Sequence, residues 1–194
     1  MARHKTFDER EALDAAMHEF WLRGYEGTSL QDLETAMGLT RTSIYNAFGN
    51  KRELFNRVLE HYQQTVMAAL LAELDSGAGL KTGVERMLNR MIDLHFSEET
   101  PGGCLVVLSV LEREQHDATS TRALEQTMAA MQKGLQQRIA KAQQTGEIDA
   151  GQDARALALS IVNTMAGMMV LGKAGFSKTA LRQVARNAVR LLQC

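Results

Sequence analysis

Apolar residues recur every three or four positions along almost the whole chain, which is the spacing of one face of an α-helix. Glycines and short polar stretches separate these periodic segments. Helices are therefore predicted over residues 6 to about 24, 28–38, 40–48, 50 to about 75, about 81–96, 118 to about 145, from about 153 onward, and about 178–192. The single proline and the abundance of Ala, Leu, Met, Gln and Glu also favour a nearly all-helical protein.

Residues 104–111, CLVVLSVL, are apolar without a periodic gap. A buried strand would fit this run as well as a buried helix. No other segment offers a partner strand, so we predict a central helix that is buried all round. The helix expected from Asn50 to about Asp75 has some 24 residues and spans roughly 36 Å, which is long enough to belong to two domains.

The stretch from Thr28 to Phe55 predicts two short helices joined by a tight turn, then the start of a third. Thr28 and Gln31 have the spacing of a capping box, Gly38 suits the end of a helix, and Thr40 suits the cap of the next one. Two helices joined in this way form a helix-turn-helix, whose second helix can lie in the DNA major groove. An ordinary helical hairpin with a polar outer face is the alternative.

The second helix of this pair carries side chains that can hydrogen-bond to a base or reach a phosphate. They are Arg41, Thr42, Ser43, Tyr45 and Asn46. Asn50 and Glu53 have the spacing of a second capping box. Lys51 is therefore expected at a helix N-terminus, where free amides and the helix dipole already favour an anion.

Residues 28–55, TSLQDLETAMGLTRTSIYNAFGNKRELF, closely resemble the N-terminal domain of TetR-type transcriptional regulators. The specific part of the match is a series spaced by three: Tyr45, Phe48, Lys51 and Leu54. With the helix before it, the match covers about the first quarter of the chain, and the remainder resembles the family only in length and helical character. The resemblance implies a three-helix DNA-binding domain at 1–52 and a helical ligand-binding and dimerisation domain at 53–194.

The resemblance also implies a homodimer on a palindromic double-stranded DNA operator, acting as a repressor that a small molecule releases. The residues expected to contact DNA are Thr28, Thr40, Arg41, Thr42, Ser43, Tyr45, Asn46 and Lys51. Arg41 and Ser43 are expected to face bases, and Thr28, Tyr45 and Lys51 to face phosphates. One position departs from the pattern, because Glu34 stands where such motifs usually place a small residue. We expect its stem to bend toward solvent.

The charge balance does not favour a general nucleic-acid coat. The net charge is −1, and residues 1–52 carry seven Arg or Lys against eight Asp or Glu. Attraction to phosphates must therefore come from the placement of a few basic residues and not from net charge.

The later helices suggest a dimer and a ligand pocket. The last two are rich in alanine and glycine, which lets helices approach closely and favours a four-helix dimer interface. Eleven methionines are many for 194 residues, and methionine is common at adaptable binding surfaces, although plain core packing accounts for most of them. Similar regulators bind an apolar or amphipathic molecule among these helices. The candidate ligand-binding residues are His61, Tyr62, Met91, His95, Cys104, Met165 and Met168. Trp21 is assigned to the core of the small domain.

Cys104 follows Pro-Gly-Gly at the start of a predicted helix. The helix dipole would stabilise a thiolate there, whereas the apolar residues that follow would raise the pKa of the thiol. A sensor of oxidants or electrophiles and a plain buried cysteine both remain open at this point.

Other classes of protein have less support. The five histidines are scattered without ligand spacing, and there is no glycine-rich phosphate loop or serine elbow, so we expect no catalytic residue, metal or cofactor. A helical protein-interaction adaptor is the alternative of another class. No run of about 18 apolar residues and no signal-peptide core are present, so we expect a soluble cytoplasmic protein without a membrane partner.

Overall fold

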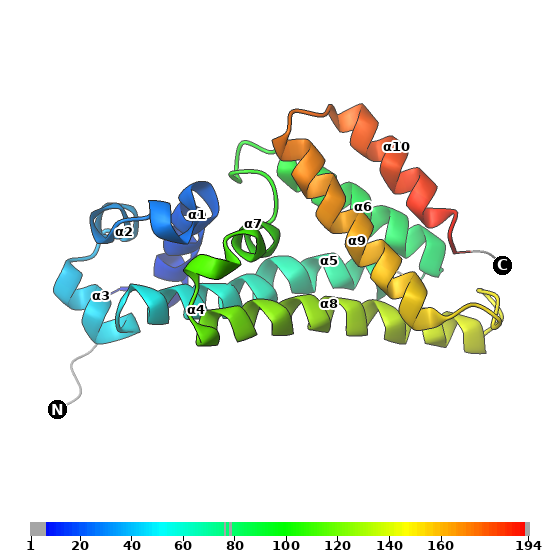
Figure 1. The fold of residues 1–194 in the computed structure, drawn as a ribbon, viewed down its shortest axis with the longest axis horizontal. Helices are drawn as coiled ribbons and strands as arrows, with labels where there is room; N and C mark the ends of the chain where they lie inside the picture. The colour runs from blue at the N-terminus through cyan, green and yellow to red at the C-terminus, as the bar shows by residue number, and fades with distance from the viewer. Residues whose placement is uncertain (1–6, 76, 78, 193–194) are drawn as a thin grey trace.

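The structure is a computed structural model that describes residues 7–75, 77 and 79–192. These residues form helices and loops without a strand, which confirms the predicted all-α fold. The α-helices are α1 (Glu9–Gly27), α2 (Leu30–Met37), α3 (Arg41–Phe48), α4 (Lys51–Tyr62), α5 (Ala68–Ala72), α6 (Leu80–His95), α7 (Leu105–Leu111), α8 (Ala118–Gln144), α9 (Ala154–Lys173) and α10 (Lys178–Val189). Figure 1 shows α1 to α3 gathered as a head around the start of α4, with α6, α9 and α10 at the far end of the molecule.

The helices of the head pack around buried apolar side chains that belong to the one apolar core of the molecule. Phe20 of α1, Leu33 of α2, Ile44 of α3 and Phe55 of α4 are fully buried. The rings of Phe20 and Phe55 meet edge-on with centroids 5.1 Å apart, a geometry that aromatic pairs prefer. Burial of each such side chain contributes roughly 1.5–3 kcal/mol, so this core fixes α3 against α4.

The boundaries of the head helices follow their caps. The side chain of Asp8 accepts hydrogen bonds from the amides of Arg10 and Glu11 and so begins α1, whereas the predicted cap Thr6 lies outside the described residues. Gly24, the expected end of this helix, is instead a kink with φ of 73°, after which the chain turns helically to Gly27. This conformation strongly favours glycine.

A single run of helical backbone joins the head to the rest of the chain. The run starts with α4, continues through a π-helical turn at Gln63–Met67 and through α5, and ends in a 3₁₀ turn at Glu73–Asp75. The predicted helix from Asn50 to Asp75 is therefore continuous, with a π-turn that the sequence did not indicate. The predicted domain boundary between residues 52 and 53 falls inside α4.

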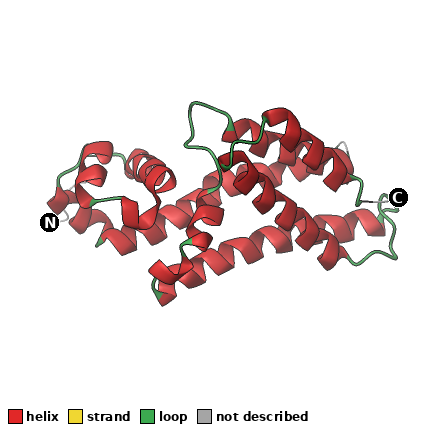
Figure 2. Cartoon of the chain, turned by 45° about the horizontal axis from the view of Figure 1, so that its top comes forward, coloured by secondary structure: helices red, strands yellow, loops and turns green. Residues whose placement is uncertain are grey.

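The body consists of α5 to α10. The longest helix, α8, packs along α9, and α10 packs against both α6 and α9. Figure 2 shows the same arrangement from a tilted view, with α8 running the length of the body. Residues 105–111 are helical as predicted, but the prediction that this helix is buried all round is wrong. Leu105 and Val106 at the start of α7 are buried, whereas Val110 and Leu111 at its end are exposed.

Helix α9 exposes apolar side chains on part of its surface. Among the described residues, α9 is the single helix long and apolar enough to cross a membrane by length and composition, and one third of that window is buried within the protomer. A core helix of a soluble protein meets the same criterion. Leu159 and Val170 are about half exposed, and Gly167 lies open on the same helix.

Candidate nucleic-acid interface and internal cavity

Helix α3 presents a continuous polar face to solvent. Arg41, Thr42, Tyr45 and Asn46 are exposed, while Ile44 on the opposite face is buried in the head. Because α3 has only eight residues and few inward contacts, most of its surface is available to a partner. This is the arrangement expected of a helix that enters the major groove.

The start of α3 is fixed by hydrogen bonds from two directions. The hydroxyl of Thr40 accepts a hydrogen bond from the amide of Ser43 at 3.2 Å, and the two hydroxyls lie 3.0 Å apart. The carboxylate of Glu34 accepts from the amide of Arg41 at 2.6 Å. The Glu34 side chain is 30% exposed, and its carboxylate caps the next helix, a role that the sequence did not indicate.

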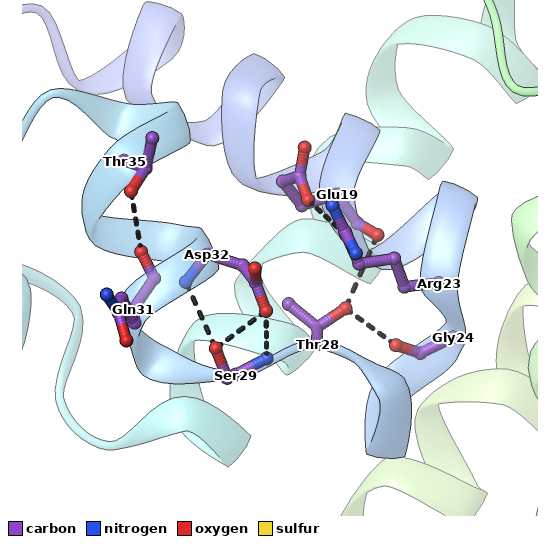
Figure 3. A network of polar contacts seen from close by, with 8 residues as sticks. All are labelled: Glu19, Arg23, Gly24, Thr28, Ser29, Gln31, Asp32 and Thr35. Carbon is purple, nitrogen blue, oxygen red and sulfur yellow. Dashed lines mark hydrogen bonds and ion pairs between the residues drawn. The ribbon is translucent and has the colours of Figure 1, made fainter.

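Thr28 does not lie on this surface. Its side chain is fully buried, and its hydroxyl donates to the carbonyls of Gly24 at 2.7 Å and of Glu19 at 3.3 Å. The cap of α2 is Ser29, which exchanges hydrogen bonds with Asp32 in a capping box, as Figure 3 shows. The predicted capping box of Thr28 with Gln31 is therefore shifted by one residue. The hydroxyl of Thr28 ties α2 to α1 and is not available to a phosphate.

Lys51 stands where predicted, at the N-terminus of α4. Asn50 and Glu53 form the expected capping box, in which the Glu53 carboxylate accepts from the Asn50 amide at 2.8 Å. The ammonium group of Lys51 lies 4.4 Å from the centroid of the Tyr25 ring, a cation–π contact. Partial burial lowers the pKa of Lys51, and Glu26 opposes the shift. Among the predicted DNA contacts, the structure groups Thr40, Arg41, Thr42, Ser43, Tyr45 and Asn46 at α3 and Lys51 just beyond it, but not Thr28.

A narrow apolar cavity lies in the body beside α1. Its free space is about 30 Å³, which is room for about two water molecules. Its wall consists of Trp21, Tyr62, Val66, Met67, Leu70, Met91, Leu94, Gly103, Cys104, Val107, Met128, Met131, Val162, Met165, Ala166 and Met169. No charged side chain is part of this wall. Six methionines line it, so the wall can change shape at low energetic cost.

The cavity contains four of the seven predicted ligand residues: Tyr62, Met91, Cys104 and Met165. The other three are placed elsewhere. His61 faces the head, with Nε2 2.6 Å from a carboxylate oxygen of Asp14. Nδ1 of His95 accepts from the amide of Gly103 at 2.6 Å, and Met168 is buried outside the wall.

Trp21, which was predicted only as a core residue of the small domain, also lines the cavity. Its indole donates to the carbonyl of Gly102 at 3.0 Å, and its ring meets that of Tyr62 edge-on at 5.2 Å. The apolar stripe of the first helix identified Trp21 as buried but could not indicate that one ring face borders a cavity of the body.

Tyr62 and Cys104 are the main polar pair of the wall. The Tyr62 hydroxyl donates to the Cys104 sulfur at 3.4 Å. Burial raises the pKa of the Cys104 thiol, although the hydrogen bond from Tyr62 and nearby backbone amides act in the opposite direction. Burial also raises the pKa of Tyr62 well above its usual range. Both groups are therefore neutral at neutral pH.

A second contact joins the head to the body. His116, in the turn before α8, stacks on Phe55 with ring centroids 5.3 Å apart and packs against Tyr25 at 5.4 Å. Beside it, Arg52 lies 3.5 Å from the carboxylate of Asp117. The corner between α7 and α8 is therefore docked on the two helices that position the DNA-facing surface.

The structure offers no evident metal site. Among the residues it describes, no three His, Cys, Asp or Glu side chains are close enough to hold an ion together.

Known protein families match both parts of the chain. Residues 12–58 match the bacterial regulatory proteins of the tetR family, and residues 82–188 match a tetracyclin repressor-like C-terminal domain. The HTH-type transcriptional repressor ComR of Escherichia coli K12 is 31% identical over 190 residues, covering 97% of this chain and 90% of ComR. An uncharacterized HTH-type regulator of Bacillus subtilis 168, YezE, is 29% identical over 82% of both chains.

Solved structures agree with the sequence comparison. A cysteine mutant of the TetR family transcriptional regulator CifR, complexed with a 26-bp double-strand operator DNA, has a TM-score of 0.87 and 32% identity. The alignment covers 97% of this chain and 98% of CifR. The reduced form of E. coli NemR has the same fold, with a TM-score of 0.83, 20% identity, and coverage of 94% of this chain and 95% of NemR.

The thiol of Cys104 should react slowly in the native protein. In a Cys194→Ser background, alkylation by N-ethylmaleimide at pH 7, followed by mass spectrometry, should be slower than in urea-unfolded protein, because burial raises the thiol pKa and leaves less thiolate. The native rate should keep rising at alkaline pH values where the unfolded rate has levelled off. A native thiol that reacts as fast as the unfolded one at pH 7 would contradict this assignment.

Proposed function

The chain belongs to the TetR family of bacterial regulatory proteins, and we propose that it represses transcription as a homodimer that a small apolar molecule releases from operator DNA. The observation that carries the DNA-binding part is the exposed polar face of α3, held by caps on a rigid apolar core. The relatives named as repressors, and the CifR complex with operator DNA, support it. Because the protein acts on DNA, we place it in the cytoplasm.

We assign roles on the DNA surface from exposure and reach. Arg41, Thr42 and Asn46 are exposed on α3 and suit base edges in the major groove. Tyr45 is exposed at the side of α3, and Lys51 follows at the start of the next helix, so both suit phosphates. The hydroxyls of Thr40 and Ser43 bond to each other, so these residues serve mainly to fix the helix.

The homodimer is proposed through α9 and α10. Leu159 and Val170 of α9 and Phe176 before α10 expose large apolar side chains, and no described element covers them. Gly167 leaves open space on the same helix, which allows close approach of a second helix. Two copies joined here would present two α3 helices to half-sites about one helical turn apart, roughly 10 bp or somewhat more.

The effector is proposed to bind in the cavity beside Trp21. The absence of charged side chains from the wall makes a charged ligand costly to bury there, so the effector should be uncharged and mainly apolar. Tyr62 and Cys104 can offer one hydrogen bond. Since the free space is about 30 Å³, a ligand must displace wall side chains, and the methionines make that possible.

Release follows from the position of the cavity along the connecting helix. Tyr62 and Val66 line the cavity, and the same helical run begins at Lys51 beside α3. A ligand that pushes this wall outward shifts the head and alters the separation of the two α3 helices in the dimer. The effector acts only through its differential affinity for the two conformers, for which about 1–3 kcal/mol is usual.

Two alternative functions, a Cys104-based sensor and a protein-interaction adaptor, have less support. Cys104 borders the cavity, but burial keeps its thiol protonated, so we treat it as a wall residue and not as an oxidant or electrophile sensor. A protein-interaction adaptor would not need the exposed base-reading side chains of α3.

Lys51→Ala should weaken binding to all DNA sequences alike. Operator DNA would be selected from a random duplex pool, and affinities measured by gel shift over a range of salt concentrations. Loss of one phosphate contact should reduce the slope of log K against log salt by about one. The control is Lys133→Ala, an exposed lysine on α8, which should leave the slope unchanged. Equal slopes for wild type and Lys51→Ala would refute the phosphate role.

Val170→Glu should convert the dimer into monomers and abolish operator binding, because a charge would be buried in an apolar interface. Sedimentation equilibrium and gel shift measure the two effects. Lys133→Glu places the same charge on exposed α8 and should leave the dimer intact. A Val170→Glu protein that stays dimeric would exclude this face as the interface.

Small uncharged aromatic compounds should stabilise the protein in a thermal-shift screen, by about 2.7 kcal/mol at a hundred times the Kd. Val162→Ile adds a methylene to the cavity wall and should abolish the shift of each hit. Val106→Ile changes a buried valine outside the wall and should preserve it. Calorimetry of a hit should show weaker binding when operator DNA is present, and equal affinity would refute the coupling.

A further inference from the structure

Glu34 is an acidic residue of α2 whose side chain contacts the start of α3, the helix proposed to face DNA. One carboxylate oxygen accepts from the Arg41 amide at 2.6 Å, and the other lies 3.7 Å from Nε of Arg41. A single carboxylate thus holds both the backbone and the side chain of Arg41. The proposed function does not use this contact.

The contact has an electrostatic consequence for DNA binding. The N-terminus of α3 has no acidic residue in its first turn, so its dipole and free amides would ordinarily attract a phosphate. The Glu34 carboxylate occupies the Arg41 amide and places negative charge at that end. The start of α3 is therefore a poor phosphate site, and nonspecific attraction to the DNA backbone is reduced there.

The contact also restricts the Arg41 side chain. The Arg41 side chain is 58% exposed, and its Nε is the guanidinium nitrogen in the ion pair with Glu34. An arginine has five N–H donors, and four of them, on the two terminal nitrogens, are not the donor of this contact. Two terminal donors held in a fixed plane match the O6 and N7 acceptors of a guanine in the major groove.

We infer that Glu34 is a positioning residue for sequence reading: it fixes Arg41 toward one base of each half-site and weakens binding to DNA of unrelated sequence. The residue acts through Arg41 and does not itself contact the operator. An alanine in its place would leave a mobile Arg41 that binds phosphates in many registers.

The test compares sequence selection by the wild type and by Glu34→Ala, using a random-sequence duplex pool. In Glu34→Ala, the preference at one position of each half-site should fall by roughly tenfold, the order expected for one arginine–guanine contact. Affinity for a fixed duplex that lacks the selected site should rise several-fold. If Glu34→Ala selected the same sequence as the wild type, with the same preference at every position, the inference would be overturned.

Two further variants separate positioning from a structural effect. Glu34→Gln can still accept from the Arg41 amide but carries no charge, so it should keep the thermal stability of the wild type and lose selectivity as Glu34→Ala does. In an Arg41→Ala background, Glu34→Ala should produce no further loss of selectivity. Two results would overturn the positioning role. One is a Glu34→Gln protein that keeps wild-type sequence selectivity. The other is a loss of selectivity from Glu34→Ala that is as large in the Arg41→Ala background as in the wild type. Glu60→Ala, an exposed acid on α4, controls for net charge.

Discussion

The rest of the structure depends on one run of helical backbone from Lys51 to Asp75 that is buried in the head at its start and in the body farther on. Leu54 and Phe55 are fully buried in the head, whereas Met67 and Leu70 are buried in the body. A packed core tolerates little sliding, so neither set of contacts can yield independently. In the proposed release, a ligand that displaces the cavity wall would therefore move the whole helix and with it the head. The π-turn at Gln63–Met67 lies where the run passes from the head into the body, and Val66 and Met67 of this turn line the cavity.

The corner between α7 and α8 restricts how that helix can move. His116 packs against the rings of both Tyr25 and Phe55, which also contact each other, and Glu112 accepts from the Tyr25 amide at 3.4 Å. Gly24 permits this approach, because a Cβ there would lie 2.5 Å from the Glu112 carboxylate. The head is thus held at two places by the body, and Cys104 and Val107 connect the second place to the cavity wall through α7. A ligand in the cavity would press on both connections.

The periodic pattern predicted nearly every helix because burial of one face dominates their stability. It failed where the outcome depended on contacts between distant or competing residues. Thr28 and Ser29 each have a partner three residues on, and only packing of Thr28 against α1 decides that Ser29 is the cap. Trp21 was correctly identified as buried, but the cavity beside it is made by five other segments. The bond from the Arg41 amide to Glu34 spans seven residues and a turn, so helical periodicity contains no signal for it.

The near-neutral charge of the head has a consequence for control. Of the basic residues near α3 that the structure describes, Arg52 is paired with Asp117, Arg57 with Glu9 and Arg41 with Glu34, and Lys51 packs on the Tyr25 ring. Phosphate contacts therefore supply a smaller share of the affinity than they would for a basic domain, and the fit of α3 in the groove supplies a larger one. In the proposed dimer, affinity that depends on the fit of α3 in the groove would be lost when the two α3 helices change their separation, whereas affinity that depends on many phosphate contacts would persist. A coupling of about 1–3 kcal/mol is then enough to change occupancy about 5- to 150-fold, which is why a weakly charged head suits a repressor that a ligand must release.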